Sequence, residues 1–118
     1  MNYSITHFEI PSPDLQRSIL FYDTVFGWKS QTMPDGKYAV FSIGDTQSGG
    51  GFDTNTKPAE QGVGPGLVIN VDNIPEMIEK IKKAGGIITQ DKTEIPGFGF
   101  YARFQDLNGN HMQIYSRT

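Results

Sequence analysis

The amino-acid sequence predicts an α+β fold built from two βαβββ modules in tandem. The segment from His7 to Gly27 aligns without a gap on the segment from Gly66 to Gly86, at a shift of 59 residues. Further along, residues 37–45 align on residues 100–108 at a shift of 63, with Tyr, Ala and Phe coinciding. An internal repeat of this kind indicates two copies of one supersecondary unit.

The first module begins with an expected strand from Ile5 to Ile10, where apolar Phe8 and Ile10 alternate with polar His7 and Glu9. Ser12-Pro13-Asp14 supplies N-cap and first-turn residues for a helix that ends at Gly27. The residues at helical spacing that we expect to face inward are Leu15, Ile19, Tyr22 and Phe26.

Three short strands are expected after this helix, at residues 28–33, 38–43 and 50–53. Asp35-Gly36 and Gly44-Asp45 mark the turns between them, because these residue types favour tight turns. The glycine run Gly49-Gly50-Gly51 indicates a bulge or a close approach of another backbone rather than a phosphate loop.

The second module repeats this order. Asn73 can cap a helix with Glu76 three residues later, Ile74, Ile78 and Ile81 share its inner face, and Lys80, Lys82 and Lys83 lie where the helix dipole favours cations. Strands are then expected at residues 87–92, 100–105 and 111–116, with Asn108-Gly109 as a hairpin turn.

We therefore expect one domain over residues 1–118, with module 1 at 1–54, a linker at 55–65 and module 2 at 66–118. The linker is rich in Pro, Gly and polar residues. Since neither module alone is expected to close a core, we expect mixed sheets curved around a shared cleft with the helices outside.

Composition narrows the classes of function. The chain has no cysteine, which excludes thiolate metal sites, disulfides and cysteine nucleophiles. A net charge of -3 with scattered basic residues argues against nucleic acid as a partner. The N-terminus lacks a basic and apolar signal sequence and no apolar run is long enough to span a bilayer, so we expect a cytoplasmic protein without a membrane partner.

The doubled βαβββ pattern, with HFEIPSPDLQRSILFYDTVFGW early and VDNIPEMIEKIKKAGG plus FQDLNGNHMQIY later, resembles the vicinal oxygen chelate superfamily. This superfamily contains glyoxalase (lactoylglutathione lyase), extradiol dioxygenases, fosfomycin-modifying enzymes and bleomycin resistance proteins. In detail the chain looks most like its lactoylglutathione-lyase-related single-domain group. The resemblance implies a lyase, isomerase or dioxygenase-like activity, a divalent metal and a homodimer.

The resemblance also implies four metal-ligand positions, and the two shifts place them at His7, Gly50, Gly66 and Gln113. Only His7 is a strong ligand, because glycine has no side chain and the Gln amide oxygen is a weaker donor than a carboxylate. We therefore expect no metal cofactor at these degenerate positions.

Strand alternation predicts which other side chains share a face with these positions, because residues two apart point the same way. If the protein is an enzyme, Glu9 or His7 is expected to act as general base and Arg103 to stabilise a developing oxyanion. Without such roles, His7 is expected to line the cleft with a hydrogen bond to Glu9 or Gln113, and Arg103 to form a cross-strand ion pair with Glu9. The further residues expected to bind a ligand are Trp28, Phe52, Asn70, Phe98, Tyr101, His111, Gln113 and Tyr115.

Two functional hypotheses follow. The first is a glyoxalase-like protein that binds a small polar organic molecule, as a lyase or isomerase-type enzyme with a degenerate metal site. The second is a non-catalytic sequestering protein of the bleomycin-resistance type, in which the aromatic side chains would stack on a ligand without a titrating base.

Overall fold

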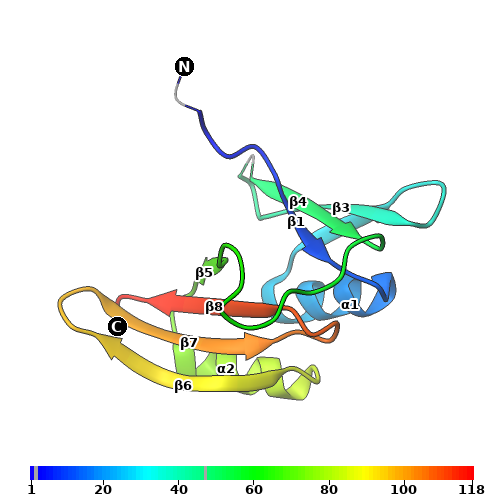
Figure 1. The fold of residues 1–118 in the computed structure, drawn as a ribbon. Coiled ribbons are helices and arrows are strands. Elements are labelled where there is room, and N and C mark those ends of the chain that lie inside the picture. The colour runs from blue at the N-terminus through cyan, green and yellow to red at the C-terminus, as the bar shows by residue number, and fades with distance from the viewer. Residues whose placement is uncertain (2, 47) are drawn as a thin grey trace. The chain divides into compact units, whose positions relative to one another are not determined.

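The computed structural model describes residue 1, residues 3–46 and residues 48–118. The chain divides into two compact units, unit 1 from Met1 to Pro58 and unit 2 from Ala59 to Thr118 (Figure 1). The boundary between the units falls inside the expected linker at 55–65. No helix in these described ranges has the length and apolar character needed to cross a membrane.

Unit 1 has the predicted βαβββ order. Its elements are β1 (Phe8–Pro11), α1 (Leu15–Phe26), β2 (Lys29–Thr32), β3 (Tyr38–Ser42) and β4 (Gly49–Asp53). The sheet order is β1-β4-β3-β2, in which β1 runs parallel to β4 and the other neighbours are antiparallel.

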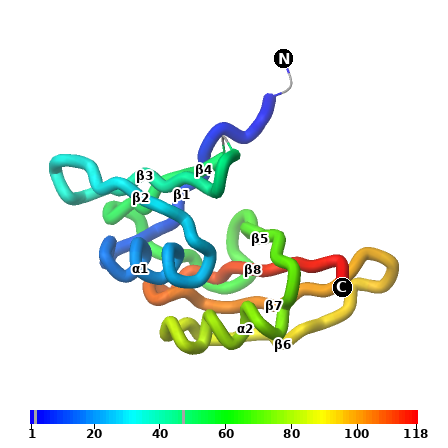
Figure 2. Tube along the Cα trace, turned by 180° about the vertical axis from the view of Figure 1, so that it is seen from behind, coloured from blue at the N-terminus to red at the C-terminus, as the bar shows by residue number. Residues whose placement is uncertain are grey.

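Unit 2 repeats the same topology, which confirms the predicted tandem repeat. Its elements are β5 (Val68–Asn70), α2 (Ile74–Lys83), β6 (Ile87–Ile95), β7 (Gly99–Gln105) and β8 (His111–Ser116). The sheet order is β5-β8-β7-β6, again with one parallel pair, β5 with β8. Figure 2 shows α2 lying along the strands of its own unit.

Both helices begin at the predicted caps. The Asp14 carboxylate accepts from the Arg17 backbone N–H at 3.3 Å, and the Asn73 side chain accepts from the Glu76 backbone N–H at 3.0 Å. α1 ends at Gly27, whose φ of 72° lies in the left-handed region that glycine adopts without strain. The caps therefore fix where each helix starts relative to the strand before it.

Unit 1 has an aromatic core between α1 and one face of its sheet. The Trp28 and Phe41 rings stack with centroids 4.9 Å apart, and Phe41 and Phe52 stack at 4.6 Å. α1 is rotated relative to the predicted inward face: the buried helix residues are Leu15, Ser18, Phe21, Tyr22 and Val25. Ile19 and Phe26 are only half-buried, whereas Phe21 is fully buried and packs edge-on against Tyr22.

Unit 2 has a mainly aliphatic core, and its predicted helix face is confirmed. Ile74, Ile78 and Ile81 of α2 are buried. From the sheet the buried side chains are Ala102, Phe104, Met112 and Ile114. In both units one sheet face is thus used by the helix, and the polar residues of each strand lie on the opposite face.

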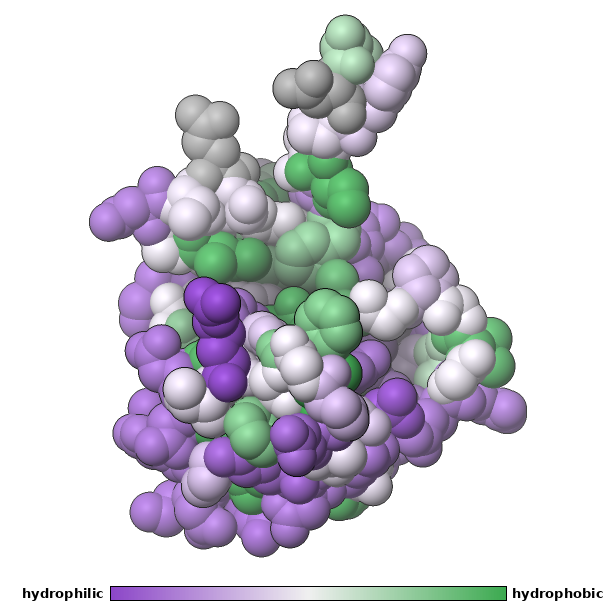
Figure 3. All heavy atoms as spheres, turned by 90° about the vertical axis from the view of Figure 1, so that its left-hand side faces the viewer, coloured by the Kyte–Doolittle hydropathy of each residue, from purple (hydrophilic) through white to green (hydrophobic). Residues whose placement is uncertain are grey.

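The strand expected from Ile5 starts only at Phe8. The first paired residues are Phe8 of β1 and Gly50 of β4, so residues 3–7 have no place in the ladder of this sheet. Tyr3 and Ile5 are each 86% exposed, and Figure 3 shows the N-terminal segment standing clear of the surface. The alternation of polar and apolar residues begins at Ile5, before the first residue that pairs with β4. For this reason the sequence pattern predicts a strand that starts too early.

Candidate functional site

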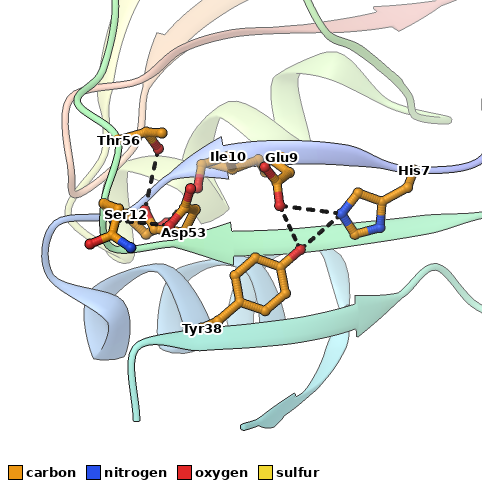
Figure 4. A network of polar contacts seen from close by, with 8 residues as sticks. His7, Glu9, Ile10, Ser12, Tyr38, Asp53 and Thr56 are labelled. Atoms are coloured by element: carbon orange, nitrogen blue, oxygen red, sulfur yellow. Dashed lines mark hydrogen bonds and ion pairs between the residues drawn. The ribbon is translucent and has the colours of Figure 1, made fainter. Parts of the chain in front are cut away.

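A cluster of three polar side chains lies on the face of the unit 1 sheet away from α1 (Figure 4). His7 precedes β1, Glu9 lies on β1, and Tyr38 is the first residue of β3. The Tyr38 hydroxyl donates to Glu9 Oε2 at 2.7 Å and lies 2.9 Å from His7 Nε2. His7 Nε2 is 3.6 Å from the same Glu9 oxygen, beyond hydrogen-bonding distance, so the Tyr38 hydroxyl bridges the two side chains in place of the expected direct hydrogen bond.

Gly51 on β4 makes room for this cluster. Its register partner across the parallel ladder is Glu9, so both residues point to the same face. A Cβ atom added at Gly51 would overlap the Tyr38 hydroxyl oxygen. The close approach expected at the glycine run is thus confirmed, and at Gly51 it is a side chain rather than a backbone that takes the space.

The Tyr38 hydroxyl is held in its protonated form. Partial burial is the largest cause, and the hydrogen bond to Glu9 and the charges of Glu9 and Asp53 add to it, so that the pKa of Tyr38 rises to about 12. At neutral pH the phenol is therefore a hydrogen-bond donor and not a base. Tyr38 is absent from the residues that the sequence singled out. Two features of the sequence could have identified Tyr38. It aligns with Tyr101, and by strand alternation it lies on the face of β3 opposite to that of the apolar Ala39 and Phe41.

A second polar region lies on the face of the unit 2 sheet away from α2. Gln90 of β6, Arg103 of β7 and Gln113 of β8 are register neighbours across three strands. Arg103 Nε is buried and has no hydrogen-bond partner among the described residues. The Arg103 guanidinium carbon lies 5.4 Å from the centre of the Tyr101 ring.

The neighbouring polar side chains on this face make defined contacts. Gln90 donates to the Tyr101 hydroxyl at 2.8 Å, and Gln105 Nε2 lies 3.1 Å from His111 Nε2. His111 Nδ1 is buried and, like Arg103 Nε, lacks a partner in the described part of the chain. The Tyr115 hydroxyl donates to the Phe98 carbonyl oxygen.

The structure places Trp28 and Phe52, two of the residues expected to bind a ligand, in the core of unit 1. Trp28 is 5% and Phe52 0% exposed, and both rings belong to the aromatic core on the α1 side of the unit 1 sheet. Of the other expected aromatic contacts, Phe98 is 74% exposed in the turn between β6 and β7, and Tyr101 lies on the polar face beside Arg103. Asn70 is exposed on β5.

The register also corrects one of the four metal-ligand positions. Val68 pairs with Gln113 in unit 2 exactly as Glu9 pairs with Gly51 in unit 1, so the equivalent of Gln113 is Gly51 and not Gly50. Gly50 pairs with Phe41 and points to the core. The shift between β4 and β8 is 62 residues rather than 63. A slip of one residue transfers a position to the opposite face of a sheet.

The corrected donor set fits a divalent metal poorly. It consists of His7, Gly51, Gly66 and Gln113, of which two have no side chain and one is a neutral amide. Over the described ranges, no group of three or more His, Cys, Asp or Glu side chains lies together. A site of the usual kind needs about three strong protein ligands, and these four positions supply only one.

Comparison with known proteins decides the family. Residues 4–44 match the family model described as "Bleomycin resistance protein-like N-terminal". A glyoxylase-like domain-containing protein of Didymella fabae is 32% identical over 123 residues, covering 96% of this chain and 93% of that protein. The chain belongs to the vicinal oxygen chelate superfamily. The resemblance seen in the sequence is thereby confirmed.

Solved structures share the fold over nearly the full chain. A hypothetical protein of S. aureus is 25% identical with a TM-score of 0.74, covering 98% of this chain and 99% of that one. The fosfomycin resistance protein FosX of Listeria monocytogenes, complexed with Mn(II) and a dihydroxypropylphosphonic acid, has a TM-score of 0.82 at 16% identity, with 100% and 93% covered. TnmS3, an antibiotic binding protein of Streptomyces, has a TM-score of 0.74 at 18% identity, with 100% and 99% covered.

Proposed function

We propose that this vicinal oxygen chelate protein binds a small polar organic molecule through an anionic oxygen group, a carboxylate or a phosphonate, at Arg103 of unit 2. The observation that supports the proposal is that Arg103 Nε is buried and has no hydrogen-bond partner within residues 1, 3–46 and 48–118. A buried N–H group that loses water without gaining an acceptor costs about 1–3 kcal/mol, and more when the group is charged. A ligand oxygen placed at this atom would remove that cost.

The chemistry around Arg103 suits such a ligand. A guanidinium offers a planar fork of N–H donors that matches carboxylate and phosphonate oxygens. Gln90 and Gln113 flank Arg103 across the sheet and bring amide groups for further polar contacts. FosX, which shares the fold, is complexed with a phosphonic acid.

The proposal takes two forms, which differ in whether bond chemistry follows binding. In the catalytic form the bound ligand reacts, and the Arg103 guanidinium stabilises the developing oxyanion. In the sequestering form the ligand is held without reaction. The glycines at 51 and 66 favour the sequestering form, because they leave the ligand set of a metal-dependent superfamily enzyme incomplete. An antibiotic binding protein is among the structural neighbours.

The test is binding of matched probes that differ in charge. We expect phenylphosphonate and benzoate to bind, measured by calorimetry or by NMR shift changes, and the neutral benzamide to bind at least about tenfold more weakly, because a charge-assisted hydrogen bond contributes about 1.5–3 kcal/mol. The substitution Arg103→Gln should weaken phenylphosphonate binding about tenfold or more.

The matched control is Arg17→Gln, which removes a guanidinium whose side chain is 64% exposed and paired with Asp14 on α1. This control should bind phenylphosphonate like the unchanged protein. Equal affinity for benzamide and benzoate, or unchanged phenylphosphonate affinity in Arg103→Gln, would contradict the proposal.

A second experiment separates the catalytic from the sequestering form. A bound probe that bears an acidic C–H group is incubated in deuterated water and analysed by mass spectrometry. Exchange of the C–H proton supports the catalytic form, and its absence supports the sequestering form.

A further inference from the structure

In unit 1 a tyrosine hydroxyl fills the place that a β4 side chain would take. The two units have the same topology, and Gly51 of β4 corresponds to Gln113 of β8. In unit 2 the Gln113 side chain rises from this position. In unit 1 there is none, and the Tyr38 hydroxyl occupies the space above Gly51. Tyr101, the counterpart of Tyr38, instead accepts from Gln90 on the far side of its strand.

The distances in the cluster fix the direction of each hydrogen bond. Tyr38 Oη and Glu9 Oε2 are 2.7 Å apart, which requires a proton between two oxygens that would otherwise repel. An ionised carboxylate has no proton to give, so the Tyr38 proton lies on that line. The Tyr38 oxygen can then only accept across the 2.9 Å to His7 Nε2, so the proton on this second line belongs to the histidine.

The surroundings reinforce this polarity. Glu9 Oε2 is also 3.6 Å from His7 Nε2, and a negative oxygen at that distance favours a proton on the facing nitrogen. Both polar contacts that the structure gives for His7 run through Nε2, while the side chain remains 41% exposed.

We propose that Tyr38, backed by Glu9, holds neutral His7 with its proton on Nε2, so that Nδ1 is the nitrogen left to accept a proton or a hydrogen bond from an O–H or N–H group of a ligand. Tyr38 is a positioning residue in this arrangement, since it acts through His7. The inference goes beyond the anion site at Arg103, and it is tested without any ligand.

This arrangement determines which ring nitrogen of His7 can accept a proton. A histidine that ligates a metal or removes a proton through Nε2 needs a lone pair there, and in this protein that atom is a donor. A base acting from His7 must use Nδ1, because Nε2 carries the proton that the Tyr38 oxygen accepts. The choice of nitrogen decides from which side of the ring a ligand can approach.

The experiment is a long-range proton–nitrogen NMR spectrum of the ¹⁵N-labelled full chain, recorded at a pH where both histidines are neutral. Only His7 and His111 contribute, since the sequence has two histidines. We expect the Nδ1–H form of His7 to be about fivefold less populated than in Tyr38→Phe, the ratio that one ordinary hydrogen bond gives. The population in Gly51→Ala should match that in Tyr38→Phe, because the added methyl group displaces the hydroxyl.

His111 is the internal control, because it lies in unit 2 and its tautomer should be identical in all three proteins. A wild-type His7 that carries its proton on Nδ1 would overturn the proposal. So would a His7 tautomer ratio that is the same in wild type, Tyr38→Phe and Gly51→Ala. Since no anion is present, this result is independent of whether Arg103 binds the phosphonate probe.

Discussion

At the scale of single residues, small changes of side chain determine what the candidate site can do. Gly51 has no side chain, and that absence lets the Tyr38 hydroxyl approach Glu9 and His7. Arg103 has a buried N–H without a hydrogen-bond partner among the residues that the structure describes, although Gln90 and Gln113 are its register neighbours. Gly51 therefore leaves room for a polar cluster on the unit 1 sheet, at a position where the family pattern has a metal ligand. On the unit 2 sheet, Arg103 presents a donor group.

The Tyr38 hydroxyl gives a prediction for the pH dependence of stability. The unfolded phenol titrates near pH 10 and the folded one at about 12, so its contribution to stability is complete below pH 10. As the pH rises from 10 towards 12, the unfolded state loses the proton first and this contribution is lost. We expect the difference in free energy of unfolding between wild type and Tyr38→Phe, measured by urea titration, to be constant from pH 7 to 9. Above pH 10 wild type should lose stability relative to the variant.

Because every other titratable group is common to the two proteins, the comparison isolates Tyr38. A difference that stays constant up to pH 11.5 would show that the phenol titrates normally. Glu9→Gln provides a second comparison: loss of the negative charge should lower the folded pKa of Tyr38 towards its unfolded value and make the loss of stability above pH 10 smaller.

At the scale of the secondary-structure elements, local signals set the helices and long-range pairing sets the strands. Asp14 and Asn73 cap α1 and α2 where expected. β6, by contrast, runs to Ile95 instead of the expected Lys92, and it does so through two register irregularities against β7. A cap depends on neighbours three residues away, whereas the end of a strand depends on how far its partner extends.

The cap of α2 gives a prediction at this scale. Asn73→Ala removes the acceptor for the Glu76 backbone N–H and should lower the free energy of unfolding by about 1 kcal/mol. Asn55→Ala is the matched control, since the Asn55 side chain is exposed and the recorded bond uses its backbone N–H. Chemical denaturation of the three proteins checks this, and equal midpoints for wild type and Asn73→Ala would refute the stabilising role of the cap.

At the scale of the whole chain, one topology is built twice with different cores. Unit 1 packs stacked aromatic rings under its sheet, and unit 2 packs mainly isoleucines. The two sheets also differ on their polar faces, with His7, Glu9 and Tyr38 on one and Arg103 with its glutamines on the other. The repeat therefore preserves the order of strands and the alternation of faces, and not the chemistry that the faces present.

The metal content of the purified protein is a prediction at this scale. Because the four family positions are His7, Gly51, Gly66 and Gln113, we expect well under one equivalent of transition metal by elemental analysis, and no lactoylglutathione lyase activity. Dialysis against a chelator should leave the unfolding midpoint unchanged. A stoichiometric metal that survives dialysis and disappears in His7→Ala would contradict this expectation.

A homodimer is the assembly that we expect. Each sheet has unpaired edges, at β1 and β2 in unit 1 and at β5 and β6 in unit 2, and association with a second copy is one way to cover such edges. Light scattering at high micromolar concentration should give twice the mass of 13.1 kDa for one chain. A monomer mass under these conditions would count against the dimer.

The order of elements, both helix caps and the inner face of α2 could be read from the sequence, because each depends on residues within one or two turns of one another. The internal repeat supplied the topology, since equal patterns fold into equal units. His7, Glu9 and Arg103 could be proposed for the same reason: strand alternation alone places them on polar faces.

Tyr38, Gly51 and the unpaired Arg103 N–H required the folded chain. A gapped alignment carries an uncertainty of one residue, and in a sheet one residue is the difference between the core and the opposite face. This difference of one residue distinguishes Gly50, which faces Phe41 in the core, from Gly51, which makes room for Tyr38. Phe52 lies in the core for a similar reason. The pairing of β4 between β1 and β3, and not the composition of β4, fixes the face to which each of its residues points.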